Sequence, residues 1–170
     1  MDSHVLLHAF REIENDIPAK ISAVHIDHGI NQNSGTWVEH CRRVCAGLGI
    51  EFILYNLDEQ CPRGESVESW ARSRRYGFFN ECVNAGEILF TAQHLDDQAE
   101  TLLIQLFRGS GPKGLSAMPE IRRFGLGWLV RPLLGFSRES LHEYAIARDL
   151  SWIEDDMNAD QNYDRNFSAP

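Results

Sequence analysis

The sequence lacks several features that would place it in a specialised class of protein. None of its apolar runs approaches the roughly 18 residues of a membrane-spanning helix, and its first residues do not show the basic-then-apolar pattern of a secretory signal. Hydrophobic residues make up 43% of the 170 residues and charged residues 24%, which excludes collagen-like, low-complexity and disordered chains. These absences predict one globular domain, without a membrane partner, located in the cytoplasm.

Paired cysteines and positive charge are also scarce. The four cysteines form no CxxC pair, and Cys41 and Cys45 fall on the apolar stripe of a predicted helix, which is typical of reduced core cysteines. Acidic side chains outnumber basic ones by 25 to 16, which gives a net charge of -9. Domains that bind nucleic acid usually have a basic balance, so a nucleic-acid partner would have to be held by local clusters or by residues outside this chain.

Strand and helix patterns alternate along the chain. Apolar runs predict strands at 21–26, 51–57 and 88–92, with a further strand inside 126–134. Helical spacing and capping residues predict helices over 3–14, 36–48 (opened by a Thr36–Glu39 capping box), 66–85, 96–108 and 137–149. This alternation indicates βαβ units, so we predict an α/β fold with a doubly wound parallel sheet. In such sheets ligands bind beyond the carboxyl ends of the strands.

The densest polar cluster follows the predicted strand 88–92. His94, Asp96, Asp97 and Glu100 lie where the next helix begins. Capping of that helix explains one carboxylate, because an acidic residue in a first turn is stabilised by the helix dipole. It does not explain three carboxylates and a histidine. Asp97 and Glu100, three residues apart, share a helix face on which they could together bind a cation or an ammonium group.

Other polar segments are less specific. Asp27 and Gly29 follow the first predicted strand, where they form either an ordinary turn or part of a site on the same rim as His94. Arg72 and Arg75 lie on a predicted helix, as a solvated face or as an anion-binding pair. The Gly-rich segment 108–114 resembles a phosphate-binding loop but follows a helix instead of opening one.

In combination, these segments resemble the tRNA(Ile)-lysidine synthase family of the N-type ATP pyrophosphatase (PP-loop) group. The matching segments, in chain order, are Asp27-His28-Gly29, His94-Leu-Asp96-Asp97-Gln-Ala-Glu100-Thr101, Arg108-Gly109-Ser110-Gly111 with Gly114-Leu-Ser-Ala-Met118, Arg131-Pro-Leu-Leu134 and the acidic, amide-rich tail 152–166. The resemblance spans nearly the whole chain.

The resemblance implies an adenine nucleotide alpha hydrolase-like, Rossmann-like form of the predicted fold, and a specific reaction. ATP would adenylate the C2 carbonyl oxygen of cytidine C34 in the CAU-anticodon tRNA(Ile), with release of pyrophosphate and assistance from Mg²⁺. The ε-amine of free lysine would then displace AMP and form lysidine. The modified base pairs with A, which changes the identity of the tRNA from methionine to isoleucine.

The pyrophosphate loop of the group, SGGxDS, has counterparts here only for its last three positions, Met1-Asp2-Ser3. The resemblance therefore implies a catalytic domain over 1–150 without its first strand and the Ser-Gly-Gly of the loop. It also implies a tail over 151–170 that leads to absent tRNA-binding domains.

The resemblance also implies roles for individual residues. Asp2, Ser3, Asp27 and His94 would bind ATP, with Mg²⁺ at Asp2; Arg72, Arg75, Asp97 and Glu100 would bind lysine; and Arg108, Lys113, Arg131 and Arg165 would contact tRNA. Asp2, Asp97 and Glu100 are the expected catalytic residues, since a carboxylate beside the ε-amine could accept its proton. A homodimer is a further expectation.

Three alternatives remain open at this point. Another PP-loop enzyme, a tRNA thiolase or an amidating ligase, has the same fold, although such thiolases usually contain CxxC pairs. In a metal-dependent phosphoesterase, Asp27-His28 and His94-Asp96-Asp97 would be metal ligands, and hydrolysis would form no AMP. A nucleotide-binding module without catalysis is the third alternative.

Overall fold

The computed structural model of the chain describes residues 1–16, 18–27, 29, 34–57, 59–111 and 115–153. The chain divides into two compact units. Unit 1 comprises Met1–Pro18 and Tyr76–Ser151, and unit 2 comprises Ala19–Arg75 and Trp152–Pro170. No helix of the described residues is both long enough and apolar enough to cross a membrane.

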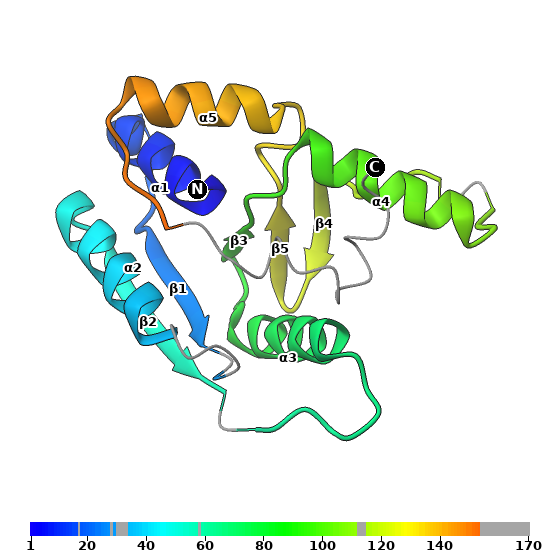
Figure 1. The fold of residues 1–170 in the computed structure, drawn as a ribbon. Helices are drawn as coiled ribbons and strands as arrows, with labels where there is room; N and C mark the ends of the chain where they lie inside the picture. The colour runs from blue at the N-terminus through cyan, green and yellow to red at the C-terminus, as the bar shows by residue number, and fades with distance from the viewer. Residues whose placement is uncertain (17, 28, 30–33, 58, 112–114, 154–170) are drawn as a thin grey trace. The chain divides into compact units, whose positions relative to one another are not determined.

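Unit 2 is built on a parallel strand–helix–strand unit (Figure 1). Strand β1 (Ser22–Asp27) pairs with β2 (Glu51–Asn56), and α2 (Ser34–Leu48), which connects them, packs on both strands. Helix α2 ends at Gly49, whose φ of 68° lies in the left-handed region that glycine adopts without strain. Because α2 already begins at Ser34, the predicted capping box at Thr36 is wrong.

Unit 1 contains a three-stranded sheet in the order β3-β5-β4 (Figure 1). Strand β3 (Ile88–Phe90) is parallel to β5 (Gly127–Val130), whereas β4 (Ile121–Phe124) and β5 form an antiparallel hairpin. Helix α3 (Val67–Cys82), whose second half belongs to unit 1, packs against one face of this sheet. The residues of this core are Tyr76, Phe79, Val83, Leu89, Phe124 and the fully buried Leu129.

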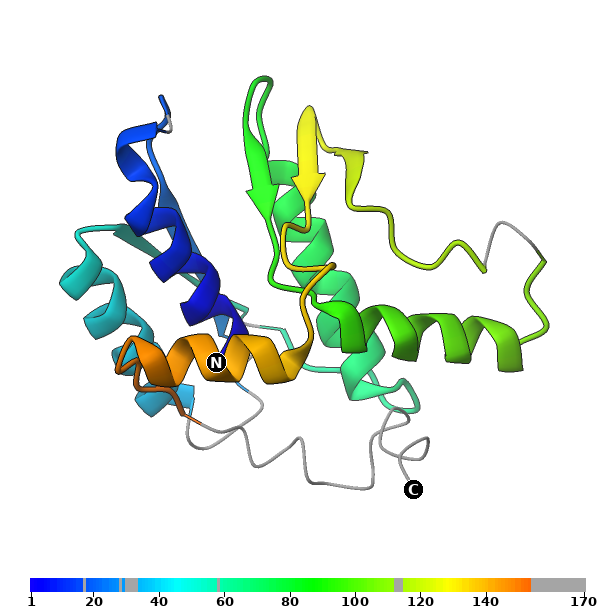
Figure 2. The ribbon, with the colours of Figure 1, turned by 90° about the horizontal axis from the view of Figure 1, so that it is seen from above.

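The remaining helices of unit 1 begin near the carboxyl end of β3 or pack on one another (Figure 2). They are α1 (Asp2–Glu12, followed by the short 3₁₀ turn η1, Glu14–Asp16), α4 (Leu95–Phe107) and α5 (Arg138–Ala147). Helix α1 packs on α5, and its Phe10 ring lies 4.6 Å from the ring of Phe90 in β3. Ser137 caps α5, because its hydroxyl oxygen accepts a hydrogen bond from the N–H of Ser140 at 3.2 Å.

The predicted α/β class with parallel strand pairs is confirmed, and one element was missed. The sequence pattern predicts a single strand inside 126–134, but β4 precedes it as an antiparallel partner. Two arginines interrupt the apolar pattern of β4, and they cover aromatic rings instead of pointing into solvent alone. The guanidinium of Arg122 lies 5.1 Å from the Phe124 ring centre, and that of Arg123 lies 3.9 Å from the Trp128 ring centre.

Gly127 lies closer to neighbouring atoms than the other described glycines of unit 1. A Cβ atom at this position would lie 2.1 Å from the carbonyl oxygen of Glu87 and 2.8 Å from Cγ1 of Val83. We therefore expect Gly127→Ala to lower the free energy of unfolding by about 3 kcal/mol, measured by urea denaturation. Gly77→Ala in α3 is the matched control: its added Cβ meets no atom within 4 Å, so it should stabilise by about 0.5–1 kcal/mol. Equal effects of the two variants would contradict this account.

Candidate functional site

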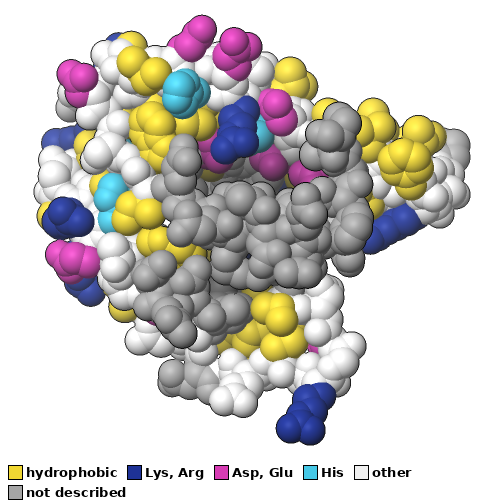
Figure 3. Space-filling view, in the orientation of Figure 1, with side chains coloured by type: hydrophobic (Ala, Val, Ile, Leu, Met, Phe, Trp, Pro, Cys, Tyr) yellow, Lys and Arg dark blue, Asp and Glu magenta, His cyan; other side chains and the backbone are white. Residues whose placement is uncertain are grey.

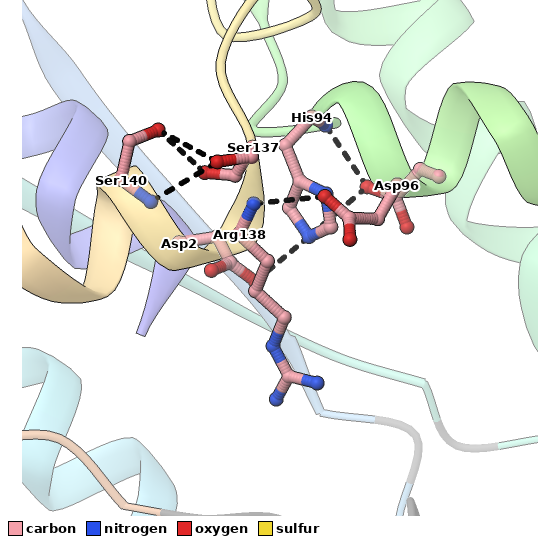
Figure 4. A network of polar contacts seen from close by, with 7 residues as sticks. Asp2, His94, Asp96, Ser137, Arg138 and Ser140 are labelled. Carbon is pink, nitrogen blue, oxygen red and sulfur yellow. Dashed lines mark hydrogen bonds and ion pairs between the residues drawn. The ribbon is translucent and has the colours of Figure 1, made fainter.

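The first turns of α1, α4 and α5 meet at the carboxyl end of β3 in unit 1 (Figure 4). Two hydrogen bonds join the starts of α4 and α5: the N–H of Leu95 donates to the carbonyl of Phe136 at 2.9 Å, and the N–H of Arg138 donates to Oδ2 of Asp96 at 2.8 Å. Helix α1 joins through Asp2, whose Oδ2 lies 3.8 Å from Nε2 of His94. Three helix N-termini, each with a partial positive charge, are thereby gathered in one place.

His94 is at the centre of this arrangement. It is the N-cap residue of α4, and its side chain is only 8% exposed. Its Nε2 lies 3.5 Å from Oδ2 of Asp97, and its Nδ1 lies 3.6 Å from Oδ2 of Asp96. Among the described residues, neither Nδ1 of His94 nor the buried Oδ1 of Asp2 has a hydrogen-bond partner. Buried polar atoms are nearly always paired, so these two mark a position where a further group would bind.

The carboxylates of the cluster also have structural roles. The N-cap of α4 is His94 and neither aspartate, but Asp97 in the first turn supplies one half of a capping box, because its Oδ2 accepts a hydrogen bond from the N–H of His94 at 3.0 Å. Asp96 instead reaches α5. Glu100 lies one turn further along α4, on the same face as Asp97, and is half-buried.

Buried hydrogen bonds fix the chain behind the cluster. Arg131 is 4% exposed, and its guanidinium donates to the carbonyl of Pro119 at 2.7 Å and to Oε1 of Gln93 at 3.2 Å. The amide of Gln98 both donates to and accepts from the main chain of Met118, each at 2.8 Å. The expected contact of Arg131 with tRNA is therefore wrong for this structure, because the side chain is occupied inside unit 1.

The start of α1 has the properties of an anion site. The first intrahelical hydrogen bonds are donated by His4 and Val5 to the carbonyl of Met1, at 2.9 and 3.1 Å, so the N–H groups of Asp2 and Ser3 precede them. N–H groups at a helix start bind phosphate readily. No three His, Cys, Asp or Glu residues of the described chain are arranged to hold a metal ion. Mg²⁺ usually takes one or two carboxylates together with substrate phosphates, and the unpartnered Oδ1 of Asp2 fits that donor set.

Three other expected site residues lie in unit 2. Asp27 ends β1, and its Oδ1 accepts a hydrogen bond from the N–H of Gly29 at 2.9 Å. Asp27 therefore forms a turn, which is one of the two roles that the sequence predicts for it. Arg72 and Arg75 lie on the exposed part of α3. Their association with Asp97 and Glu100 of unit 1 stays a prediction.

The expected tRNA contacts are only partly within the described residues. Arg108 is exposed where α4 ends, whereas Lys113, Arg165 and the tail 154–170 lie outside the described residues.

One residue of the site was missed in the sequence analysis. Arg138 stands at the start of α5, and the rule that ligands bind beyond the carboxyl ends of strands could have included it, since its helix follows β5.

A second polar network joins α1 to α5 away from the cluster. The hydroxyl of Tyr144 donates to Oε2 of Glu12 at 2.8 Å, Nε of Arg148 donates to Oε1 of Glu12 at 2.8 Å, and Nδ1 of His8 lies 3.0 Å from the Tyr144 hydroxyl. The hydrogen bond from Arg148 lowers the pKa of Glu12. Desolvation, reinforced by Glu12, raises the pKa of Tyr144 to about 12. This network orients α1 and hence Asp2.

Comparison with known proteins gives relatives along the whole chain. A family profile described as a PP-loop domain matches residues 1–168. The tRNA(Ile)-lysidine synthase of Pseudomonas syringae pv. tomato is 48% identical over 169 residues, and that of Coxiella burnetii is 43% identical over 167 residues; each match covers 98% of this chain and 37% of the relative. The chain thus spans little more than a third of the length of these curated relatives.

A solved structure shares the fold at low sequence identity. The U34-tRNA thiolase of Methanococcus maripaludis, solved with its [4Fe-4S] cluster, matches with a TM-score of 0.73 and 18% identity. The match covers 90% of this chain and 55% of the thiolase chain.

The α1–α5 network predicts a pH-dependent stability. Because the folded-state pKa of Glu12 lies below its ordinary 4.5, its contribution is complete above pH 4.5 and is lost as the pH falls through the folded-state pKa. Glu12→Gln should therefore be less stable than the wild type at pH 7, and the difference should disappear in acid. It should also decrease as the pH rises through about 12, where Tyr144 ionises. Urea unfolding across this range measures it.

Glu143→Gln, which changes another exposed glutamate, on α5, is the matched control and should show no such pH-dependent difference. A difference for Glu12→Gln that persisted unchanged in acid would show that the network does not depend on the ionised carboxylate.

Proposed function

Because this chain belongs to the PP-loop family, we propose that the protein containing it ligates lysine to C34 of the CAU-anticodon tRNA(Ile) at the expense of ATP. The product would be lysidine, formed through an adenylated cytidine, with AMP and pyrophosphate released. The observation that carries this proposal is the 48% identity, over 98% of this chain, to a relative named tRNA(Ile)-lysidine synthase. We also propose that the reaction takes place in the cytoplasm.

ATP binding is supported by the family and by the start of α1. The N–H groups of Asp2 and Ser3 would hold the phosphates, with Asp27 and His94 as further residues of the ATP site. Oδ1 of Asp2 would bind Mg²⁺, which would neutralise charge developing on the phosphate oxygens. Asp2 would remain oriented by His94, whose Nε2 lies 3.8 Å from its other carboxylate oxygen.

Lysine would be held by Asp97 and Glu100, which lie on one face of α4. Asp97 uses Oδ2 for the N–H of His94, and its side chain is still 38% exposed, so Oδ1 supports an interaction with the ε-ammonium group. A carboxylate beside this group would also accept the proton that the amine must lose before it attacks. Arg72 and Arg75 are proposed to bind the carboxylate of lysine.

The tRNA contacts are proposed at Arg108, Lys113 and Arg165. Residues 101–119 contain Arg108 and Lys113 and no acidic residue, in a chain whose net charge is -9, and this local excess of positive charge supports phosphate contacts there. A homodimer is proposed through the exposed apolar side chains of α4 (Figure 3), among which Phe107 is 80% exposed. Analytical ultracentrifugation at several protein concentrations, which measures the molecular mass in solution, tests whether the protein forms this homodimer.

The thiolase alternative has less support. All four cysteines lie among the described residues, all are free, and no three of them approach one another as ligands of a cluster. The likeness to the M. maripaludis thiolase, at 18% identity, concerns the fold. Lysine-dependent release of AMP in the presence of the CAU-anticodon tRNA, with no sulfur donor, separates the two functions.

The roles of Asp97 and Glu100 can be separated from helix capping. Asp97→Asn retains a side-chain oxygen that can accept the hydrogen bond from His94, so the stability should change little. In the intact protein, we expect Asp97→Asn and Glu100→Gln to raise the KM for lysine or lower kcat more than about tenfold. The KM for ATP should remain within about twofold, and equal losses for ATP and lysine would place these carboxylates at the phosphates instead.

The role of Asp2 is tested through the nucleotide. Asp2→Asn should reduce lysine-dependent AMP formation more than about a hundredfold, because it removes the proposed Mg²⁺ ligand while preserving the size of the side chain. The dependence of the remaining activity on the Mg²⁺ concentration should shift upward. Glu14→Gln, an exposed substitution in η1, is the control. Activity of Asp2→Asn within twofold of the wild type would rule out this assignment.

A further inference from the structure

We propose that Arg138 is a further substrate-binding residue, whose guanidinium binds the pyrophosphate portion of ATP where α1, α4 and α5 begin. This inference rests on the proposed function, since it concerns the same ATP site. It adds a residue from α5, a part of the chain to which no ligand role was attached by the sequence motifs.

The main chain of Arg138 is fixed at the cluster by its neighbours. Its N–H donates to Oδ2 of Asp96, and the preceding residue, Ser137, caps the helix. The carbonyl of Phe136 accepts the N–H of Leu95, so the two helix starts are joined on both sides of Ser137. The backbone from which the Arg138 side chain extends is therefore held in place before any ligand arrives, which lowers the entropic cost of binding.

The side chain of Arg138, in contrast, is exposed and extends away from α5 (Figure 4). In the described part of the chain, its guanidinium makes no hydrogen bond or ion pair. It thus differs from Arg131, whose guanidinium is buried and bonded, and from Arg148, which is paired with Glu12. Five N–H donors are consequently available for a ligand.

The neighbouring buried atoms indicate that this place takes a ligand. His94 is more than nine-tenths buried, and its Nδ1 is without a hydrogen-bond partner among the described residues, as is Oδ1 of Asp2. The same Oδ2 of Asp96 that accepts the N–H of Arg138 lies 3.6 Å from this Nδ1. The unpaired atoms and the main chain from which the Arg138 side chain extends therefore belong to one cluster.

The three carboxylates of the cluster make phosphate binding unfavourable unless a positively charged side chain is also present. Asp2, Asp96 and Asp97 would repel phosphate, whereas the three helix starts each supply roughly half a positive charge. Among the contacts of the described residues, Arg138 is the Lys or Arg residue joined to one of these carboxylates, through the hydrogen bond from its N–H to Asp96. A guanidinium binds two phosphate oxygens at once, whereas an ammonium group binds as a point charge. Pyrophosphate, which presents several such oxygens, is the ligand that this geometry suits.

The test compares Arg138→Ala, Arg138→Lys and the wild type in the intact protein. Inorganic pyrophosphate is the probe: its dissociation constant is measured by calorimetry in the presence of Mg²⁺, and the KM for ATP and for lysine are measured through AMP formation. We expect Arg138→Ala to weaken pyrophosphate binding and raise the KM for ATP by about tenfold to a hundredfold, as for loss of a charge-assisted hydrogen bond. Arg138→Lys should restore part of the affinity, and the KM for lysine should stay within twofold.

Arg123→Ala is the matched control, since it removes another exposed guanidinium of unit 1, one that stacks on Trp128, and it should leave pyrophosphate binding unchanged. Urea unfolding checks that both alanine variants are folded. The proposal would be overturned if Arg138→Ala bound pyrophosphate with an affinity within twofold of the wild type. It would also be overturned if only the KM for lysine rose, because Arg138 would then bind the carboxylate of the lysine substrate. If the wild type forms no AMP yet binds pyrophosphate through Arg138, the proposed function fails and this site stands.

Discussion

The hydrogen bond from the N–H of Arg138 to Asp96 is the interaction on which the arrangement of the site depends. It joins the first turns of α4 and α5, residues that are 42 positions apart in the chain. Once these turns are joined, His94 is enclosed between Asp96, Asp97 and Asp2. Helix α1 is held from its other end by Glu12, Tyr144 and Arg148, so Asp2 has little freedom to move away. Three helix starts are thus fixed around one buried histidine.

The carboxylates at this point combine two tasks that are usually separate. Asp97 supplies one half of the capping box of α4, and capping contributes about 1 kcal/mol to stability. A tenfold effect on substrate binding corresponds to about 1.4 kcal/mol, which is a similar energy. The magnitude of a loss therefore does not identify the task. What separates them is the quantity that changes: the free energy of unfolding for a cap, and the KM or kcat for one substrate for a binding residue.

The fold itself does not specify the reaction. A thiolase chain with 18% identity has the same architecture with a TM-score of 0.73, whereas the relatives with 43–48% identity are named lysidine synthases. In a fold of this kind the chemistry is specified by side chains placed at the carboxyl ends of strands and at the starts of helices. Here those positions hold carboxylates, a histidine and arginines, and the four free cysteines form no metal-binding group with other residues that the structure describes.

The sequence by itself determined the elements whose signals are local. Apolar runs identified β1, β2 and β3, helical spacing identified α1 to α5 within a few residues, and the polar cluster after β3 identified the place of the site. Strand β4 was missed because Arg122 and Arg123 interrupt its apolar pattern, and only the pairing with β5 makes it a strand.

Tertiary structure alone decided which partner each polar residue has. Asp96 was expected to be a cap of its own helix or a ligand, and it serves α5 instead. Arg131 was expected to contact tRNA, and its side chain is buried and hydrogen-bonded to Pro119 and Gln93. The physical reason is the same in each case: a local sequence pattern encodes the periodicity of one element, whereas a hydrogen bond between residues far apart in the chain exists only after the elements have packed.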